Sequence, residues 1–141
     1  MKRTEYLWYE DSGIAICNIY YKDLVFSGEA VCHPDDKEFM SRISGCEIAE
    51  MRAVIKYLQH IKNNELRPSI QALTDYYNTM TQSAKFNQKS YENKMLWRRI
   101  QLLKDDLVAT QENIVLIKKK LRDYLAKKEK MHEVIRNIRK K

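Results

Sequence analysis

The chain has 141 residues, of which 44% are hydrophobic and 32% charged, and its formal net charge is +7. This hydrophobic fraction excludes a wholly disordered chain, and no apolar run approaches the roughly 18 residues that span a bilayer. With only three glycines, neither a glycine-rich dinucleotide loop nor a P-loop can be written in the sequence. Because the first residues lead into no signal-peptide core, we expect a soluble, cytoplasmic protein. The missing phosphate-binding loops argue against a nucleotide-binding enzyme, and we expect neither a cofactor nor a small-molecule substrate.

Three strands are predicted at the N-terminus, over residues 5–10, 14–21 and 24–31, where β-branched and aromatic residues lie between short turn signals. The connections Asp11-Ser12-Gly13 and Lys22-Asp23 suit hairpins, which makes the strands an antiparallel meander. Both faces of the middle strand are largely apolar or aromatic. We therefore expect helices or a partner to cover one face or both.

After Pro34 the hydrophobic period becomes helical. Ser44 and Glu47 form a capping box that predicts the start of a helix reaching about Leu66. Pro68 suits the first turn of a second helix over residues 68–82, and residues 83–90 are predicted to form a loop. The first helix has an apolar stripe that is expected to face the sheet: Ile48, Met51, Ile55, Leu58 and Ile61.

The strongest pattern begins near Ser90, after which the chain has neither glycine nor proline. Apolar residues alternate there at spacings of four and three over six heptads, which is typical of a coiled-coil seam. At 1.5 Å per residue the seam would run about 64 Å, longer than a domain of this size covers by itself. Its positions are Leu96, Ile100, Leu103, Leu107, Thr110, Ile114, Ile117, Leu121, Tyr124, Lys128, Met131, Ile135 and Ile138.

A second copy, an antiparallel helix of the same chain or a different protein could bury this seam. A long parallel homodimer is disfavoured because Arg99 would lie opposite Lys104. We predict a homodimer, since the seam and the two-sided sheet exceed what one copy covers. Its oligomer seam would be the apolar positions from Leu96 to Tyr124. The alternative is a helical hairpin folded on its own domain.

The two halves of the chain differ in charge. Residues 1–66 hold 8 basic and 11 acidic residues, whereas residues 67–141 hold 18 and 8. This division predicts an α+β protein with an acidic module of three strands and a helix at 1–66, followed by a basic, coiled-coil helical region at 67–141. Any polyanion or partner would bind the second region, through Arg98, Arg99, Lys118, Lys119, Lys120, Lys127, Lys130, Arg136 and Arg139.

Those basic residues would contact nucleic-acid phosphates whatever the base sequence, and Trp97 beside two arginines could stack on bases. A solvated helix face rich in lysine is the structural alternative. No base-reading motif accompanies the basic residues.

Catalytic and metal-binding patterns are weak. The cysteines Cys17, Cys32 and Cys46 are odd in number and include no C-x-x-C pair, so buried thiols are expected instead of disulfides or zinc ligands. His33, His60 and His132 are scattered, and Asp35, Asp36 and Glu38 suit the first turn of a helix. We therefore expect neither an enzyme nor a metal site.

Residues 28–36 follow the pattern G-x-A-x-C-x-P-x-D, and residues 49–53 follow A-x-x-R-A. This combination resembles small proteins from phages and prophages of Gram-positive bacteria. Three strands and a helix also resemble the last part of a double-stranded-RNA-binding domain, although Asp35, Asp36 and Glu38 replace the basic helix start of that family.

The phage resemblance implies an effector acting in the host cell, such as an inhibitor of a CRISPR nuclease or another defence. Two functional hypotheses follow. The first is a non-enzymatic interaction protein that binds and modulates a host protein or nucleoprotein. The alternative is a protein that binds nucleic acid directly through its basic helices.

Overall fold

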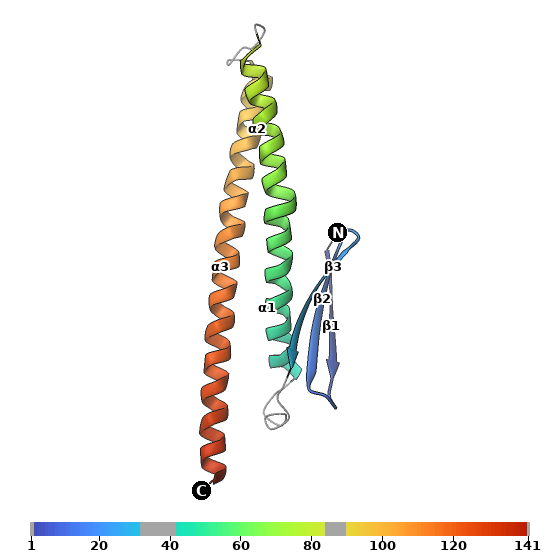
Figure 1. Cartoon of the computed structure of the whole chain (residues 1–141), viewed down its shortest axis with the longest axis vertical. Coiled ribbons are helices and arrows are strands. Elements are labelled where there is room, and N and C mark those ends of the chain that lie inside the picture. Colours follow the sequence, from blue (N-terminus) through green and yellow to red (C-terminus); the bar gives the residue numbers. More distant parts are fainter. Residues whose placement is uncertain (1, 32–41, 84–89, 141) are drawn as a thin grey trace. The chain divides into compact units, whose positions relative to one another are not determined.

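The computed structural model describes residues 2–31, 42–83 and 90–140, apart from the side chains of residues 132, 135, 139 and 140. A three-stranded antiparallel sheet is followed by helices, the last of them long, which confirms the predicted α+β class (Figure 1). The predicted loop at 83–90 lies mostly outside the described residues, as do the predictions for Cys32, His33 and the acidic residues at 35, 36 and 38.

The sheet is a meander in the order β1-β2-β3. The predicted bounds of the second and third strands are confirmed, while the first strand begins three residues earlier, at Lys2, because it pairs with β2 as far as Tyr21. Gly13 and Lys22 turn the chain in the two hairpins with φ of 66° and 54°, the left-handed region that suits tight turns. The strands are β1 (Lys2–Tyr9), β2 (Ile14–Tyr21) and β3 (Leu24–Val31).

Three helical segments follow one another without interruption: α1 (Arg42–His60), the π-helix η2 (Ile61–Leu66) and α2 (Arg67–Thr81). The predicted N-cap at Ser44 is wrong, because Ser44 lies inside α1. Its side chain is buried and hydrogen-bonds to Tyr124 instead of capping the backbone. The predicted boundary between residues 66 and 67 also falls within this helical run.

As predicted, Pro68 lies in the first turn of α2, but the π-helix joins α1 to α2 without a break. The Arg67 N–H donates to the carbonyl oxygen of Lys62, five residues earlier, which widens the helix by one residue. Proline has no N–H and collides with the carbonyl four residues before it in a regular helix. The wider turn comes directly before Pro68, so the helix continues.

The last helix, α3, spans Tyr91–Lys140, which confirms the prediction of an unbroken helix from about Ser90 to at least residue 135. Ser90 caps its start by accepting a hydrogen bond of 3.2 Å from the Asn93 N–H. The chain divides into two compact units. We call residues 1–57 with 114–141 the sheet unit, and residues 58–113 the hairpin unit.

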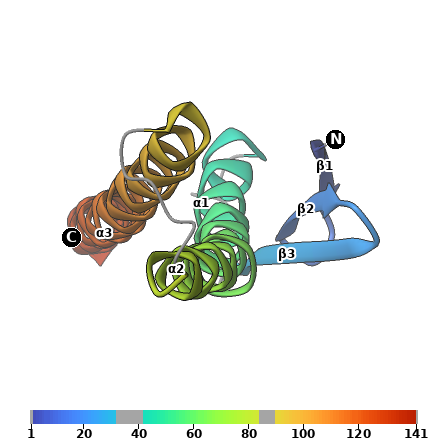
Figure 2. The same cartoon turned by 90° about the horizontal axis from the view of Figure 1, so that it is seen from above.

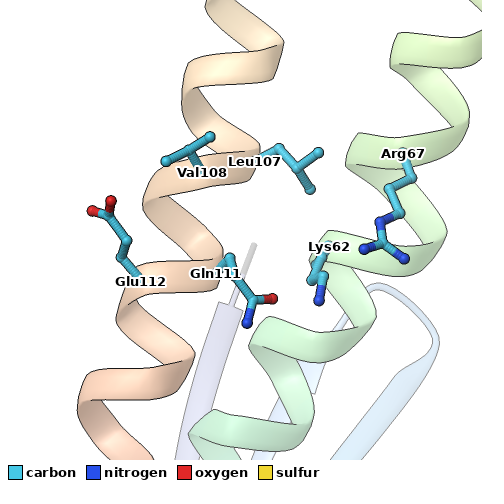
Figure 3. A pocket seen from close by; sticks show the side chains of 6 residues that line it. All are labelled: Lys62, Arg67, Leu107, Val108, Gln111 and Glu112. Carbon is cyan, nitrogen blue, oxygen red and sulfur yellow. The ribbon is translucent and has the colours of Figure 1, made fainter.

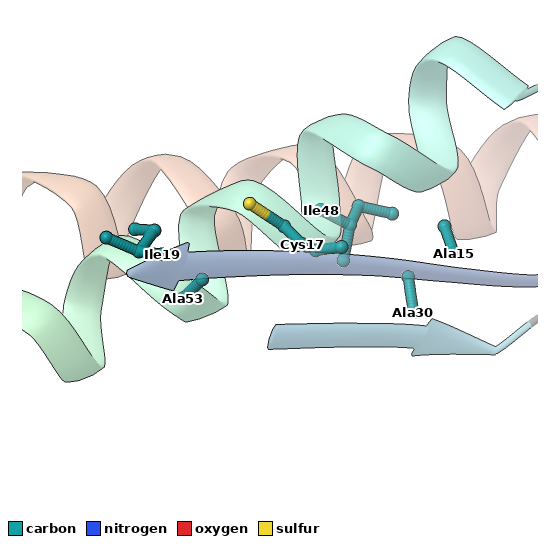
Figure 4. Packing of buried hydrophobic residues seen from close by; sticks show 7 residues of the cluster. Ala15, Cys17, Ile19, Ala30, Ile48 and Ala53 are labelled. Carbon is teal, nitrogen blue, oxygen red and sulfur yellow. The ribbon is translucent and has the colours of Figure 1, made fainter. Parts of the chain in front are cut away.

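In the sheet unit, one face of the sheet packs on α1. Ala15, Cys17 and Ile19 of β2 are buried with Ala30 of β3 and with Ile48, Ala49 and Ala53 of α1 (Figure 4). Of the predicted apolar stripe, Ile48 is part of this core, and the other core residues of α1 are the small Ala49 and Ala53, which the sequence analysis did not assign to the contact. A Cβ atom at Gly28 would overlap backbone atoms of Ala49 and Ala53.

The other face of the sheet carries Leu7, Tyr9, Ile14, Ile16 and Val31 at one end, where Tyr9 and Val31 are 50% and 61% exposed. Within the sheet unit, α1 packs on the face that carries Ala15, Cys17 and Ile19, and therefore meets only one of the two apolar faces expected from the sequence.

A polar network stiffens the opposite end of that face. The Glu5 carboxylate accepts hydrogen bonds from Tyr20 (3.0 Å) and Asn18 (3.3 Å), and Ser27 donates to Asn18 (2.6 Å). The guanidinium of Arg3 stacks over the Tyr20 ring at 4.5 Å. The hydrogen bond to Glu5 is the main cause that raises the pKa of Tyr20.

Candidate binding surfaces

The predicted seam faces inward in both units. In the sheet unit Ile114 is buried, Ile117 is half-buried, and Leu121 and Tyr124 pack against the core that α1 shares with the sheet. Burial, with a hydrogen bond to Glu47, raises the pKa of the Tyr124 hydroxyl. A helix of the same chain, one of the three predicted coverings, therefore contacts this part of the seam.

In the hairpin unit Ile100 is only 1% exposed, and the other predicted seam positions, Leu96, Leu103 and Leu107, are half-buried. The rings of Tyr77 and Trp97 join α2 and α3, with centroids 5.2 Å apart. The apolar seam positions from Leu96 to Tyr124 are thus buried or half-buried in the single chain. Beyond it Met131 and Ile138 are 56% and 66% exposed.

The predicted basic residues lie on the solvent side of α3. Residues 114–141 hold 11 basic and 3 acidic residues, and Lys118, Lys119, Lys120, Lys127, Lys130 and Arg136 are exposed. Lys128, in the seam, lies over the Tyr124 ring at 5.5 Å. Arg98 and Arg99 are also exposed but belong to the hairpin unit, and the side chain of Arg139 is not described.

Sequence reasoning missed a second apolar set on α3. In the sheet unit, Val115 and Leu116 are 56% and 48% exposed although both are hydrophobic. They follow the buried Ile114 by one and two positions, which turns them about 100° and 200° away from it. A repeat in the sequence could have indicated these residues. Outside the seam, Val108 and Val115 are seven residues apart, and Leu102 and Leu116 are fourteen residues apart.

Val115 shares its face of α3 with two exposed cations, Lys119 one turn further along and Arg122 two turns further along. Lys119 also lies three residues after Leu116 and is therefore its neighbour on the helix surface. We call these four residues the outer patch. Exposed apolar side chains next to cations can bind an apolar hollow with an acidic rim, because the apolar atoms contribute burial and the cations contribute orientation.

A pocket of about 320 Å³ lies in the hairpin unit beside the π-helix. In Figure 3 the side chains of Leu107 and Gln111 extend from α3 toward Lys62 and Arg67. The Gln111 carbonyl oxygen is buried and accepts no hydrogen bond from the described residues. The carboxylate of Glu112 lines the same pocket as the two cations, and Arg67 is exposed, so the lining does not favour an anion.

Of the two described cysteines, one is a buried thiol, as the sequence predicts. Cys17 is fully buried, and burial raises the pKa of its thiol to about 11, with a further contribution from Glu50. Burial and a hydrogen bond to the same Glu50 raise the pKa of Tyr6 to about 12. Cys46 is half-buried and free. Within residues 2–31, 42–83 and 90–140, no three side chains are grouped as metal ligands.

The residues that carry the phage resemblance have packing roles where they are described. Gly28, Ala49 and Ala53 allow the close approach of α1 to β3, and Arg52 donates a hydrogen bond of 2.6 Å to the Glu29 carbonyl oxygen. The motif therefore accounts for how the helix sits on the sheet.

Over the part of the chain that the structure describes, no helix is long and apolar enough to cross a membrane. Comparison with known protein families, with characterised proteins and with solved structures found no match.

Proposed function

We propose that this chain is a non-enzymatic interaction protein of phage type. It binds and inhibits a host protein or nucleoprotein machine, such as a CRISPR nuclease or another defence nuclease, in the cytoplasm of the host cell. The outer patch of α3 is the observation that supports binding of a partner by this chain. The class of target rests on the resemblance of residues 28–36 and 49–53 to phage proteins.

The energetics of the outer patch favour a protein partner. Val115 and Leu116 leave about half of their surface in water, while Ile114 beside them is 3% exposed. Fully burying a side chain of this kind contributes about 1.5–3 kcal/mol. A partner that covered both side chains and met Lys119 and Arg122 with carboxylates would gain affinity and orientation together.

The proposal predicts that Val115→Ser with Leu116→Ser abolishes inhibition without unfolding the chain. We would express the parent in a Gram-positive strain with active CRISPR interference and count plaques of a targeted phage. The parent should restore plaques, and the double variant should lose most of that effect because the apolar contact is gone. Circular dichroism should show the same helicity for both.

The matched control is Leu102→Ser with Val108→Ser, two equally exposed apolar residues of α3 in the hairpin unit. This control should restore plaques like the parent. Equal activity of the Val115/Leu116 variant and the parent would remove the outer patch from the proposal. A parent that neither restores plaques nor retains a host nuclease after nucleic acids are digested would overturn the inhibitor assignment.

Direct nucleic-acid binding is the second candidate, favoured by the excess of 11 basic over 3 acidic residues in 114–141. Replacing Lys118, Lys119 and Lys120 with glutamine keeps helix propensity and much of each stem but removes three exposed charges. A nucleic-acid-binding protein should then lose affinity, and the slope of log affinity against log salt should become shallower by up to about 3.

Fluorescence anisotropy with duplex and single-stranded probes, between about 50 and 200 mM salt, measures this slope. A protein-binding effector should keep its fold and lose only the share of target affinity that Lys119 of the outer patch contributes. Unchanged affinity and slope for both probes would exclude the three lysines as the nucleic-acid surface.

A further inference from the structure

The two edge strands of the sheet, β1 and β3, differ in whether side chains of the sheet unit occupy their outer edge. Figures 1 and 2 show β3 on the side of the sheet near α1 and β1 on the far side. From α1, Lys56 donates to the Ser27 carbonyl oxygen at 2.7 Å, and Arg52 donates to the Glu29 carbonyl oxygen at 2.6 Å. These carbonyls lie on the outer edge of β3, so side chains of α1 already occupy the positions that another strand would need.

The direction of those carbonyls also determines which backbone groups of β1 point away from β2. Because Ser27 and Glu29 point away from β2, their partners Asn18 and Ile16 direct their backbone groups toward β1. The alternation along β1 then turns the backbone groups of Lys2, Thr4, Tyr6 and Trp8 outward. Among the described residues β1 pairs with β2 alone, so this eight-residue edge is open to a further strand.

We propose that a second copy of this chain pairs with this edge, β1 against β1 in antiparallel orientation, so that two copies share one six-stranded sheet. The charge sequence of the strand supports a copy of itself as the partner. Lys2 and Arg3 begin β1, whereas Glu10 and Asp11 follow its end. An antiparallel copy sets the basic end of each strand beside the acidic end of the other, as a two-fold interface requires.

Two registers set the outward backbone groups of two copies against each other over seven residues of β1, with the two-fold axis at Glu5 or at Tyr6. An axis at Glu5 would place this carboxylate opposite that of the second copy, so the register centred on Tyr6 is favoured. Lys2 then lies opposite Glu10 of the second copy, and Arg3 lies opposite Tyr9. These pairs combine attraction between unlike charges with a cation–aromatic contact. Apart from Glu10, which directly follows β1, these side chains belong to the strand, as do the outward backbone groups of Thr4 and Tyr6. The interface therefore needs no contribution from the helical seam. It also stands apart from the proposed function, because a dimer can form without the outer patch.

The first test removes a hydrogen-bond donor from the outer edge. In Thr4→Pro the outward N–H is lost, while the ladder between β1 and β2, which uses Arg3 and Glu5, is kept. Multi-angle light scattering should give twice 16.9 kDa for the parent at micromolar concentration. Thr4→Pro should raise the dimer dissociation constant at least about 100-fold, since two-fold symmetry removes the donor twice. The matched control Thr4→Val keeps the N–H and should remain dimeric.

The second test reverses charges and does not depend on how the Thr4→Pro substitution affects folding. Lys2→Glu should raise the dissociation constant by about fivefold or more, because two ion pairs become repulsive. Adding Glu10→Lys should restore the parent affinity, since unlike charges again face each other. A parent of 16.9 kDa at micromolar concentration overturns the proposal. A dimer that survives Thr4→Pro, or a charge reversal without restoration, overturns it too.

Discussion

Replacing Gly28 with valine is expected to lower the free energy of unfolding by about 3 kcal/mol or more. Even a Cβ atom at this position would overlap the carbonyl oxygen of Ala49 and the backbone nitrogen of Ala53, and neither is the end of a flexible side chain. The helix must therefore move away from the sheet, which opens the core around Cys17. Urea unfolding followed by circular dichroism measures the loss.

Ser27→Val is the matched control, because it adds the same side chain one residue away on the opposite face of β3. The Ser27 side chain is exposed and donates a hydrogen bond to Asn18, which the substitution removes, while the carbonyl oxygen that accepts from Lys56 is kept. We expect this substitution to change the free energy of unfolding by less than about 1 kcal/mol. Equal stability of the two valine variants would contradict the close packing of α1 on β3.

Ile114→Asp is expected to cost the sheet unit about 3–5 kcal/mol, because Ile114 is 3% exposed and a buried carboxylate without a partner is among the most destabilising changes. Far-UV circular dichroism during thermal unfolding should show a large fall in the melting temperature of the variant.

Val115→Asp provides the control on the next residue, which is 56% exposed, and it should change stability by about 0.5 kcal/mol or less. The hairpin unit offers the same comparison, with Ile100 at 1% and Leu102 at 58% exposure. If Asp at Ile114 and at Val115 had equal effects, the 4-3 pattern would not mark the buried face of α3.

Much of the secondary structure could be predicted from local pattern. The second and third strands have the predicted bounds because turn residues flank apolar runs that suit paired strands. The helix α3 runs through the predicted span because no glycine or proline interrupts its apolar repeat. The repeat also identified the inward face correctly, since the positions from Leu96 to Tyr124 are buried or half-buried.

Local pattern failed where a residue's role depends on a distant part of the chain. Ser44 has the sequence of an N-cap, but its buried side chain contacts Tyr124, eighty residues later. Pro68 lies in the first turn of α2 as predicted, but local pattern did not indicate the π-helix that joins α1 to α2. The outer patch was missed because the sequence does not show whether the apolar residues Val115 and Leu116 are buried or exposed, and only the structure gives their exposure.

The sequence by itself determined which elements form and which face of α3 avoids water, because periodicity depends only on the geometry of one helix or strand. Only the tertiary structure decided what covers each face. A helix of the same chain contacts the seam, Gly28 admits α1 to the sheet, and Lys56 and Arg52 occupy the edge of β3 but leave β1 open. An apolar repeat indicates that a surface is buried. Which segment buries it depends on the shape, charge and backbone groups of the elements that pack together.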